Sequence, residues 1–410
     1  MRIFKLIWYF FFWTYVRLGL SYYYRRIKLS GIEHIPKGVP VIFGSNHENA
    51  LIDPLLKTTR FPLMIHYLVR ADVFNNSAIR WFLNSLNLMP VYRMSDGVNT
   101  VKANEQIFRN CFEVFKKGEH LILYPEGTHE SRRIPRPAKK GIARIALGAM
   151  NEPDAPEELY IVPFGMNYSA HRKFRSAVHI KFGEAIRVDK VPDTPENIEK
   201  LRDQYEAAVS KCHVSLPKKR FEVLDKIFFH DQEPRIVLEP EDINEKAWRL
   251  DQLLTDEQAE EVLGFAKKME KVGIKFPFHF RQNYWFTIFL IFVLLPFALL
   301  GIALHFPLIM LGRFIMRGIK DKVFTDTMFF GVGLVLAPFT WIILGITVSK
   351  YSENPWIGML SVFFAGTCLI TARIVVRLWE AFRNNRKLRK ARLLQEYKSF
   401  VSIINIIRQA

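Results

Sequence analysis

The sequence predicts an α/β domain, built on a mixed sheet flanked by helices, followed by an α-helical transmembrane region. Between Leu29 and about Val209, short β-branched runs alternate with amphipathic helical stretches, a pattern typical of α/β domains. Residues 284–312 carry no acidic or basic side chain, and 328–348 and 356–376 form two further apolar runs of membrane-spanning length. A chain of 410 residues has room for both parts.

The charge balance favours a membrane over a nucleic acid as the partner. The formal net charge is +18, which suits an anionic partner, and the basic residues flank the long apolar runs. The sequence carries no zinc-type Cys/His spacing, RNA-binding aromatic signature or helix-turn-helix pattern. We therefore expect anionic membrane lipid as a partner, no nucleic acid, and neither a metal nor another cofactor. The three widely separated cysteines form no disulfide framework, which fits a reducing compartment.

Residues 1–28 predict a membrane-interfacial helix. The unbroken apolar run from Leu6 to Val16 is too short to cross about 30 Å of hydrocarbon. Its Trp and Tyr content is typical of a helix that lies in the membrane interface. The alternative is a tilted span in which Arg17 extends towards the headgroups. The run is not followed by the small-residue cleavage site of a signal peptide.

The predicted α/β domain covers residues 29–215. Asn76 or Ser77 is placed to cap one helix, and Gly118 is placed to end another. We expect strands at 39–45, 64–70, 88–93, 120–128, 160–169 and 177–186, and helices at 76–87, 100–117 and 138–150. In residues 216–283, charges and helical periodicity replace the strands, which predicts a charged helical linker or a small helical subdomain.

The first apolar segment, 284–312, predicts a broken re-entrant membrane hairpin. A straight helix of that length would extend about 43 Å, which is more than a bilayer core needs, and Pro296, Gly301 and Pro307 interrupt it. Basic residues follow and precede the segment, so the positive-inside rule places both of its ends in the cytoplasm. The alternative is one tilted helix.

Two transmembrane helices, at 328–348 and 356–376, complete the predicted membrane region. Residues 377–410 then predict a basic cytoplasmic tail, because Arg and Lys are dense there. We expect this tail to form an amphipathic helix on anionic lipid.

His47 is the strongest candidate for a base. Histidine titrates near neutral pH, and a neighbouring carboxylate fixes its tautomer. The strand ending at Ser45 places Asn46 and His47 at the carboxyl edge of the sheet, where open α/β sheets bind ligands. Asp53 is the candidate partner. On a regular helix its side chain would lie about 120° from that of His47, so the two can pair only if the backbone turns between them.

Asp53 and Pro54 form a natural helix start, with Asp at the N-cap and Pro at the first helical position. A loop over residues 47–52 followed by a helix would therefore bring Asp53 to His47. The alternative is that Asp53 is only a cap and His47 only a polar loop residue.

A second polar motif, YPEGTHESRR at 124–133, also follows a buried strand. Gly127 allows the backbone to approach a ligand closely, and Glu126 can bind hydroxyl groups or order the turn. Basic residues nearby, including Lys139, suit a phosphate group. The alternative is an ordinary turn with a solvated basic face.

Two further residues are weaker candidates. Arg93 lies at the predicted end of a strand and can form a bidentate contact with phosphate, although an isolated arginine is more often a surface residue. Pro163 lies near the end of a predicted strand and can shape a substrate pocket, although by itself it is equally a core residue.

The four stretches NHENALIDP, MPVYRMSDG, YPEGTHESRR and IVPFGMNYS resemble, in this order, the four blocks of the glycerolipid acyltransferase superfamily. The likeness covers about residues 30–210. The first block usually has four residues between His and Asp, whereas this chain has five. A subset of the superfamily resembles the longer NHxNxxxDP form and likewise has apolar segments after the catalytic domain.

The resemblance implies His47 as general base and Asp53 as the residue that orients it. It implies that Arg93 binds the phosphate of the acceptor, that Glu126, Gly127 and Thr128 belong to the acceptor site, and that Pro163 marks the fourth block. Asn46 and Lys139 complete the predicted substrate-binding residues.

The implied activity is a membrane-bound O-acyltransferase of phospholipid biosynthesis. An acyl thioester, on coenzyme A or acyl carrier protein, would acylate glycerol-3-phosphate or 1-acylglycerol-3-phosphate, with the catalytic domain cytoplasmic at a bacterial inner membrane or the endoplasmic reticulum. The alternatives are another lysolipid acceptor or a non-catalytic membrane lipid-binding protein.

Overall fold

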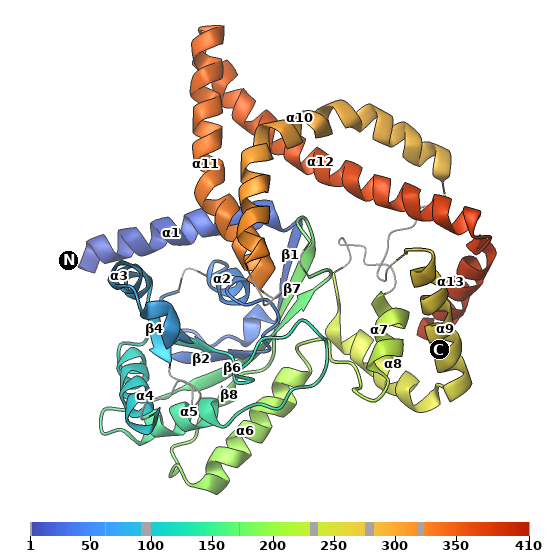
Figure 1. The fold of residues 1–410 in the computed structure, drawn as a ribbon. Coiled ribbons are helices and arrows are strands. Elements are labelled where there is room, and N and C mark those ends of the chain that lie inside the picture. The colour runs from blue at the N-terminus through green and yellow to red at the C-terminus, as the bar shows by residue number, and fades with distance from the viewer. Residues whose placement is uncertain are drawn as a thin grey trace. The chain divides into compact units, whose positions relative to one another are not determined.

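The computed structural model describes seven ranges of the chain: residues 2–61, 63–91, 100–171, 173–229, 237–274, 283–318 and 324–409. It divides into two compact units (Figure 1). The first comprises Met1–Tyr168, Ala177–Ser215 and Val237–Glu241, and the second comprises Ser169–Ser176, Leu216–Ile236 and Asp242–Ala410.

The first unit is built on a mixed eight-stranded sheet with the order β1-β7-β6-β2-β5-β3-β4, and β8 pairs with β6. The pairs from β6 through β2, β5 and β3 to β4 are parallel, whereas β7 and β8 run antiparallel to β6. The strands are β1 (Arg26–Ser30), β2 (Val41–Ser45), β3 (Ile65–Arg70), β4 (Leu88–Val91), β5 (His120–Leu123), β6 (Tyr160–Tyr168), β7 (Ala177–Phe182) and β8 (Ile186–Arg187).

The main core of this unit lies between the sheet and three helices, α4 (Thr100–Lys116), α5 (Gly141–Asn151) and α6 (Pro195–Ser210). Gly44 in β2 lets α6 approach closely, because a Cβ there would lie 2.6 Å from the Tyr205 ring. The core side chains are fully or almost fully buried and include Ile42, Cys111, Phe115, Leu121, Ile142, Ile161 and Tyr205.

The predicted α/β architecture is confirmed, with element ends that differ by a few residues. Helix α3 (Ser77–Ser85) begins as expected after Asn76, whose side chain accepts hydrogen bonds from the N–H groups of Ala78 and Ile79. The sequence did not predict β1, which moves the start of the domain from residue 29 to residue 26. This strand has a half-buried, edge position, so its residues lack the strong apolar signal of the central strands.

Helix α1 (Arg2–Tyr23) packs on the sheet domain through one face. The Trp13 indole N–H reaches the carbonyl oxygens of Thr58 and Phe61, at 2.9 and 3.0 Å, at the end of α2 (Ile52–Thr58). The opposite face of α1 exposes a stripe of large apolar side chains, spaced mainly one helical turn apart: Ile3, Phe4, Ile7, Phe11 and Leu18. An exposed apolar stripe of this kind is typical of a surface that meets a membrane.

Three helices of the described residues are long and apolar enough to cross a membrane. They are α10 (Tyr284–Arg317), α11 (Phe324–Ser352) and α12 (Pro355–Lys390), and all belong to the second unit. The last two contain the predicted spans 328–348 and 356–376.

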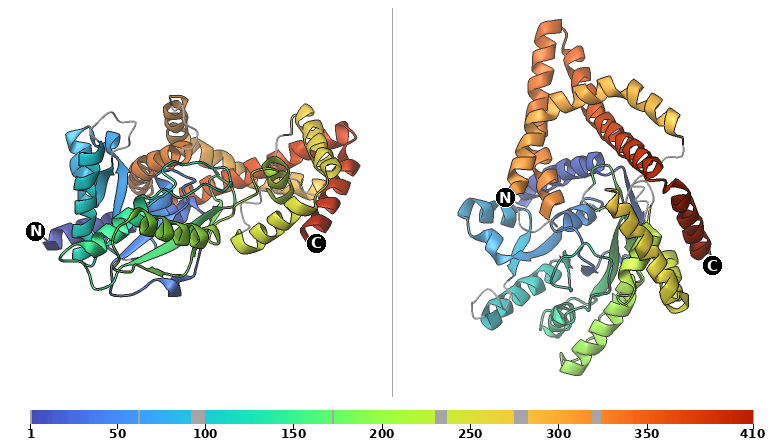
Figure 2. Two further views of the ribbon diagram at one scale, coloured as in Figure 1. Left: turned by 90° about the horizontal axis from the view of Figure 1, so that it is seen from below. Right: turned by 45° about the vertical axis from the view of Figure 1, so that its right-hand side comes forward.

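The predicted break of residues 284–312 into a hairpin is not present. Residues Tyr284–Arg317 form one continuous helix that accommodates Pro296 and Pro307, and this helix bends along its length (Figures 1 and 2). Proline removes one helical hydrogen bond and bends the axis, but in an apolar segment the helix continues because no other hydrogen-bond partners are available.

Close contacts join the three apolar helices. At Gly301 in α10, an added Cβ would lie 2.3 Å from the carbonyl oxygen of Cys368 in α12. The Trp341 indole of α11 donates a hydrogen bond of 2.9 Å to Nε2 of His305 in α10, and Nδ1 of the same ring bonds the Gly301 carbonyl oxygen. Small residues at helix crossings and such side-chain bonds are typical of membrane helix packing.

The region predicted as a helical linker or small helical subdomain is a helical subdomain within the second unit, and the predicted tail shares its core. Apolar side chains of α7 (Phe221–Phe229), α9 (Asp256–Lys271), the end of α12 and α13 (Leu394–Gln409) share a single core. Leu388 is completely buried in it, and Phe265 stacks on Phe400 with ring centroids 4.4 Å apart. The described side chains near the start of the C-terminal helix, Tyr397 and Phe400, therefore pack on protein, where the sequence predicted lipid.

Truncation of this core should destabilise the subdomain. Leu388→Ala should lower the free energy of unfolding by about 2–5 kcal/mol, because it removes a fully buried side chain. Thermal unfolding of the detergent-solubilised chain measures this, with the exposed neighbour in Lys390→Ala as the matched control. Equal stability of the two variants would contradict the packed subdomain.

Candidate active site

Strand register brings two predicted polar motifs together. Gly44 of β2 pairs with Leu123 of β5 in parallel, so the residues three positions later, His47 and Glu126, leave the sheet side by side. The His47 backbone N–H donates to a Glu126 carboxylate oxygen at 3.2 Å. Both residues lie at the carboxyl edge of the parallel strands, as predicted.

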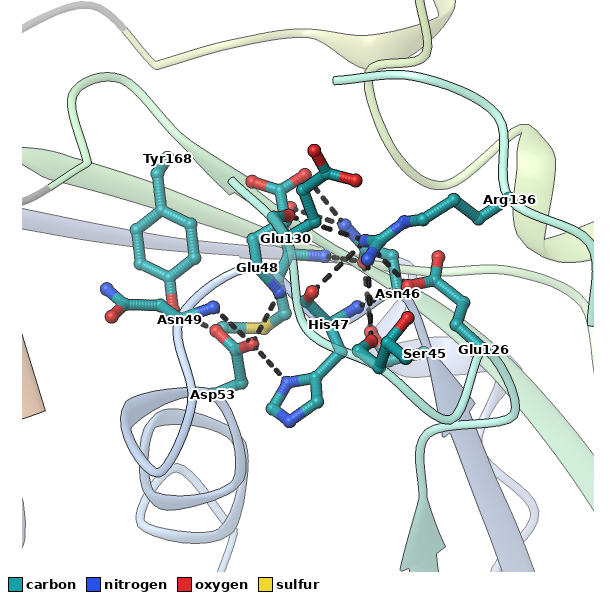
Figure 3. Close-up of polar contacts among 12 residues, drawn as sticks. Ser45, Asn46, His47, Glu48, Asn49, Asp53, Glu126, Glu130, Arg136 and Tyr168 are labelled. Carbon is teal, nitrogen blue, oxygen red and sulfur yellow. Dashed lines mark hydrogen bonds and ion pairs between the residues drawn. The ribbon is translucent and has the colours of Figure 1, made fainter. Parts of the chain in front are cut away.

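The Asp53 carboxylate is the centre of the site (Figure 3). Its Oδ2 atom accepts hydrogen bonds of 2.8 Å from His47 Nδ1 and from the backbone N–H groups of Glu48 and Asn49. The buried Tyr168 phenol donates to the other oxygen, Oδ1. Figure 3 shows the imidazole and the phenol approaching the carboxylate from different sides.

The turn that the spacing required is present between His47 and Asp53. Ala50 has φ of 35°, a left-handed conformation that non-glycine residues rarely adopt. Asp53 is not the N-cap, however, because α2 begins at Ile52 and Leu51 occupies the cap position without a side-chain bond. The reason is that the Asp53 oxygen binds the N–H groups of the preceding turn instead of those of its own helix.

The contact with Asp53 sets the tautomer of His47. An ionised carboxylate only accepts hydrogen bonds, so Nδ1 carries the proton and Nε2 keeps its lone pair. The Tyr124 ring stacks on the imidazole at 4.1 Å between centroids, and His129 meets it edge-on at 5.7 Å. The His47 side chain is 18% exposed, so a substrate can reach it.

Asn46 acts on the protein rather than on a ligand. Its side-chain N–H₂ group donates to Glu48 and to the Met166 carbonyl oxygen, and its Oδ1 accepts from the Met166 N–H and the Ser45 hydroxyl. Every hydrogen-bonding position of this buried amide is therefore used. Asn46 fixes the residue before His47 against β6, which corrects the predicted substrate contact.

Arg136 joins the second motif to His47, and the sequence did not single it out. Its Nη2 atom lies 2.6 Å from Glu126 Oε2 and donates to the His47 carbonyl oxygen at 3.1 Å. Its Nη1 atom donates to the carbonyl oxygen of Thr128. In the sequence, Arg136 is distinguished only by its position between two prolines in a basic loop.

Gly127 and Lys139 lie against each other. Gly127 has φ of 70°, and a Cβ there would lie 2.6 Å from the Lys139 ammonium nitrogen. The Lys139 N–H also donates to the Pro125 carbonyl oxygen and closes the loop. This places a cation beside Glu126 at the edge of the site, where the sequence predicted a basic group.

The two weaker candidates have different outcomes. Pro163 is buried within β6 opposite Gly44, and its carbonyl oxygen accepts from Gly183, so its contacts are those of the sheet. From β6 the site uses Met166 and Tyr168 instead. Arg93 lies outside the described residues. Within the described ranges, the His, Cys, Asp and Glu residues form no group of three placed to hold a metal ion.

The pKa values of two acidic side chains beside His47 are shifted well above the ordinary range of a carboxyl group. Burial raises the pKa of Glu48 to about 7, against the opposing charge of Arg133. Burial likewise raises the pKa of Glu126 to about 8, while the Arg136 guanidinium acts in the opposite direction. Groups with such shifts concentrate at functional sites, because water exclusion and nearby charges both act there.

Removal of the Tyr168 hydroxyl should destabilise the first unit. Tyr168→Phe leaves the buried Asp53 carboxylate without one donor, so the free energy of unfolding should fall by about 1.5–3 kcal/mol. Tyr160→Phe is the control, since that hydroxyl makes only a 3.4 Å contact with Glu158. If chemical denaturation finds the two variants equally stable, the Asp53–Tyr168 bond does not contribute.

Glu48→Gln should stabilise the protein in a pH-dependent way. Burial raises the pKa of Glu48 to about 7, whereas the ordinary pKa of a glutamate is 4.5, so folding becomes less favourable as the pH rises between these values. Glutamine removes this penalty. The variant should gain up to about 3 kcal/mol at pH 8 and little at pH 4. Thermal unfolding at both pH values measures the difference, and an equal effect at both would contradict a buried carboxyl.

Comparisons with known proteins point to an acyltransferase domain. The Acyltransferase family model matches residues 26–167. Glycerol-3-phosphate O-acyltransferase 1 of Saccharomyces cerevisiae is 36% identical over 85 residues, which is 20% of this chain and 11% of that protein. The 1-acyl-sn-glycerol-3-phosphate acyltransferase of Bacillus subtilis is 24% identical over 140 residues, 33% of this chain and 67% of that protein.

Among solved structures, a 1-acyl-sn-glycerophosphate acyltransferase from Thermotoga maritima matches with a TM-score of 0.33 and 20% identity, over 44% of this chain and 68% of that one. The chain thus spans about a tenth of the yeast relative and two thirds of the Bacillus relative. The family match covers the residues that carry His47, Asp53 and the Glu126–Gly127 turn. Residues 26–167 thus match the Acyltransferase family, and the relatives that the chain resembles carry the names of glycerol-3-phosphate and 1-acylglycerol-3-phosphate acyltransferases.

Proposed function

We propose that the protein is a membrane-bound O-acyltransferase of phospholipid biosynthesis. It transfers a fatty acyl group from an acyl thioester, on coenzyme A or acyl carrier protein, to glycerol-3-phosphate or 1-acylglycerol-3-phosphate. One observation carries the proposal: His47 Nδ1 is bonded to the buried Asp53 carboxylate, so Nε2 is a hydrogen-bond acceptor at the open edge of the sheet. A neutral imidazole held in this way is a general base.

The reaction needs one proton transfer in each direction. His47 Nε2 removes the proton from an acceptor hydroxyl as its oxygen attacks the thioester carbonyl carbon, which forms a C–O bond and a tetrahedral oxyanion. Collapse of the oxyanion breaks the C–S bond. The departing thiolate takes the proton from the imidazolium, which restores the base. Asp53 stabilises the transient positive charge on His47 through the Nδ1 bond.

A phosphorylated acceptor fits the charges at this edge. The Lys139 ammonium lies at Gly127, and an ammonium is a common phosphate partner. Arg136 forms an ion pair with Glu126 and donates a hydrogen bond to the His47 carbonyl oxygen. In this proposal it therefore stabilises the loop instead of binding phosphate. Arg93 is a second phosphate ligand in this proposal on the strength of the sequence resemblance.

Membrane attachment fits lipid chemistry. The three apolar helices and the exposed stripe of α1 are the membrane-facing elements in this proposal. Helices before α10 and after α12 share one core, so both ends of the membrane region lie on the same side and the three apolar helices make an even number of complete crossings. The basic residues from Arg377 to Arg392 favour the cytoplasmic side. The catalytic domain would then work at the cytoplasmic face, beside anionic lipid.

Replacement of the base should abolish transfer. His47→Ala should lower the rate about 10²–10⁴-fold, the usual contribution of a general base, and Asp53→Asn should lower it comparably because the tautomer is no longer fixed. Thiol release from an acyl thioester, in detergent-solubilised protein with each acceptor in turn, measures both. His34→Ala, a histidine bonded to the Phe182 carbonyl oxygen away from the site, is the control.

Comparison of glycerol-3-phosphate with 1-acylglycerol-3-phosphate in this assay identifies the acceptor. Near-normal transfer by folded His47→Ala would refute the role of the base. Absence of thiol release with every phosphorylated acceptor and donor would favour a lipid-binding protein without this activity.

A further inference from the structure

Two arginines from different helices meet near the end of α2. Arg60 follows the last turn of α2, and both of its terminal nitrogens lie 3.4 Å from the hydroxyl oxygen of Ser21 in α1. Arg17 precedes Ser21 by one turn of α1, and the Arg17 backbone carbonyl oxygen accepts the Ser21 hydroxyl hydrogen at 2.8 Å. The two guanidinium groups therefore share one corner of the first unit.

This corner has excess positive charge. Burial lowers the pKa of Arg60 to about 10, and the neighbouring charge of Arg17 adds to the effect. Among the described residues, no carboxylate forms an ion pair with Arg17 or Arg60, and the Arg60 Nε–H is buried without a hydrogen-bond partner. Two adjacent cations with an unused buried donor are unfavourable unless an anion binds between them.

The surroundings indicate which anion. Arg17 lies over the Trp13 ring at 4.9 Å and next to exposed Leu18, at the border of the apolar stripe of α1. A small cavity of about 70 Å³ adjoins it between α1 and α2, lined by apolar side chains such as Trp13, Val16 and Leu55. Phosphate beside hydrocarbon is the chemistry of a phospholipid at the membrane surface.

We propose that Arg17, Arg60 and Ser21 bind the phosphate group of an anionic phospholipid from the bilayer that α1 contacts. The guanidinium groups supply charge-assisted hydrogen bonds, and the Ser21 hydroxyl oxygen orients the Arg60 guanidinium by accepting from both of its terminal nitrogens. Arg60 lies seven residues after Asp53, about 10 Å further along the direction of α2. The site is therefore separate from the catalytic centre, and it anchors the helix that carries Asp53.

The test measures lipid binding to the full chain and does not depend on the proposed reaction. Native mass spectrometry of the detergent-solubilised protein compares retention of phosphatidylglycerol with that of phosphatidylcholine. Arg17→Gln and Arg60→Gln should each weaken phosphatidylglycerol binding about five-fold, and the double variant on the order of thirty-fold, from about 1 kcal/mol for each surface cation. Phosphatidylcholine retention should not change.

Three controls separate this site from other effects. Arg187→Gln removes an exposed arginine of the same unit that pairs with Glu158, and should bind phosphatidylglycerol normally. His47→Ala should bind it normally too, whatever its effect on acyl transfer. The Arg17→Lys/Arg60→Lys variant keeps both charges and should retain much of the affinity, which shows that α1 remains folded.

Two results would overturn the proposal. One is unchanged phosphatidylglycerol retention in the double glutamine variant. The other is arginine-dependent binding of inorganic phosphate as tight as that of phosphatidylglycerol, which would make the corner a site for soluble phosphate instead of lipid.

Discussion

The Asp53 carboxylate is the interaction on which the rest of the site depends. One buried, negatively charged group accepts from the His47 ring, from two backbone N–H groups of the turn and from the Tyr168 phenol. Burial of a carboxylate is costly unless such donors surround it. The same bonds that compensate for burial therefore hold the strained turn, orient the imidazole and attach α2 to β6.

The sheet supplies the frame for this carboxylate. Parallel pairing of β2 with β5 delivers His47 beside Glu126, and pairing of β2 with β6 brings Met166 and Tyr168 to the same edge. The Asn46 side chain fixes the end of β2 against β6, because its amide group donates to the Met166 carbonyl oxygen and accepts from the Met166 N–H. Helix α1 packs on the far end of α2, so one short helix joins the contact with α1 to Asp53.

The sequence predicted the parts of the site that are local. A buried strand followed by Asn46-His47 and another followed by Glu126-Gly127 point to one sheet edge, because parallel strands share their carboxyl ends. The roles of Arg136 and Tyr168 were not predicted, because these residues act through tertiary contacts. They lie 89 residues from His47 and 115 residues from Asp53, respectively. The packing of Tyr397 and Phe400 at the start of the C-terminal helix was not predicted for a similar reason, since an apolar face shows the same spacing whether it packs on lipid or on protein.

The tautomer of His47 tests the central claim most directly. Nitrogen-15 spectra of histidine-labelled protein, with His47 assigned by its loss in His47→Gln, distinguish the two neutral imidazole forms among the 11 histidines. We expect neutral His47 to carry its proton on Nδ1, with this preference lost in Asp53→Asn. A neutral His47 protonated on Nε2, in the folded wild-type protein, would contradict the proposed general base.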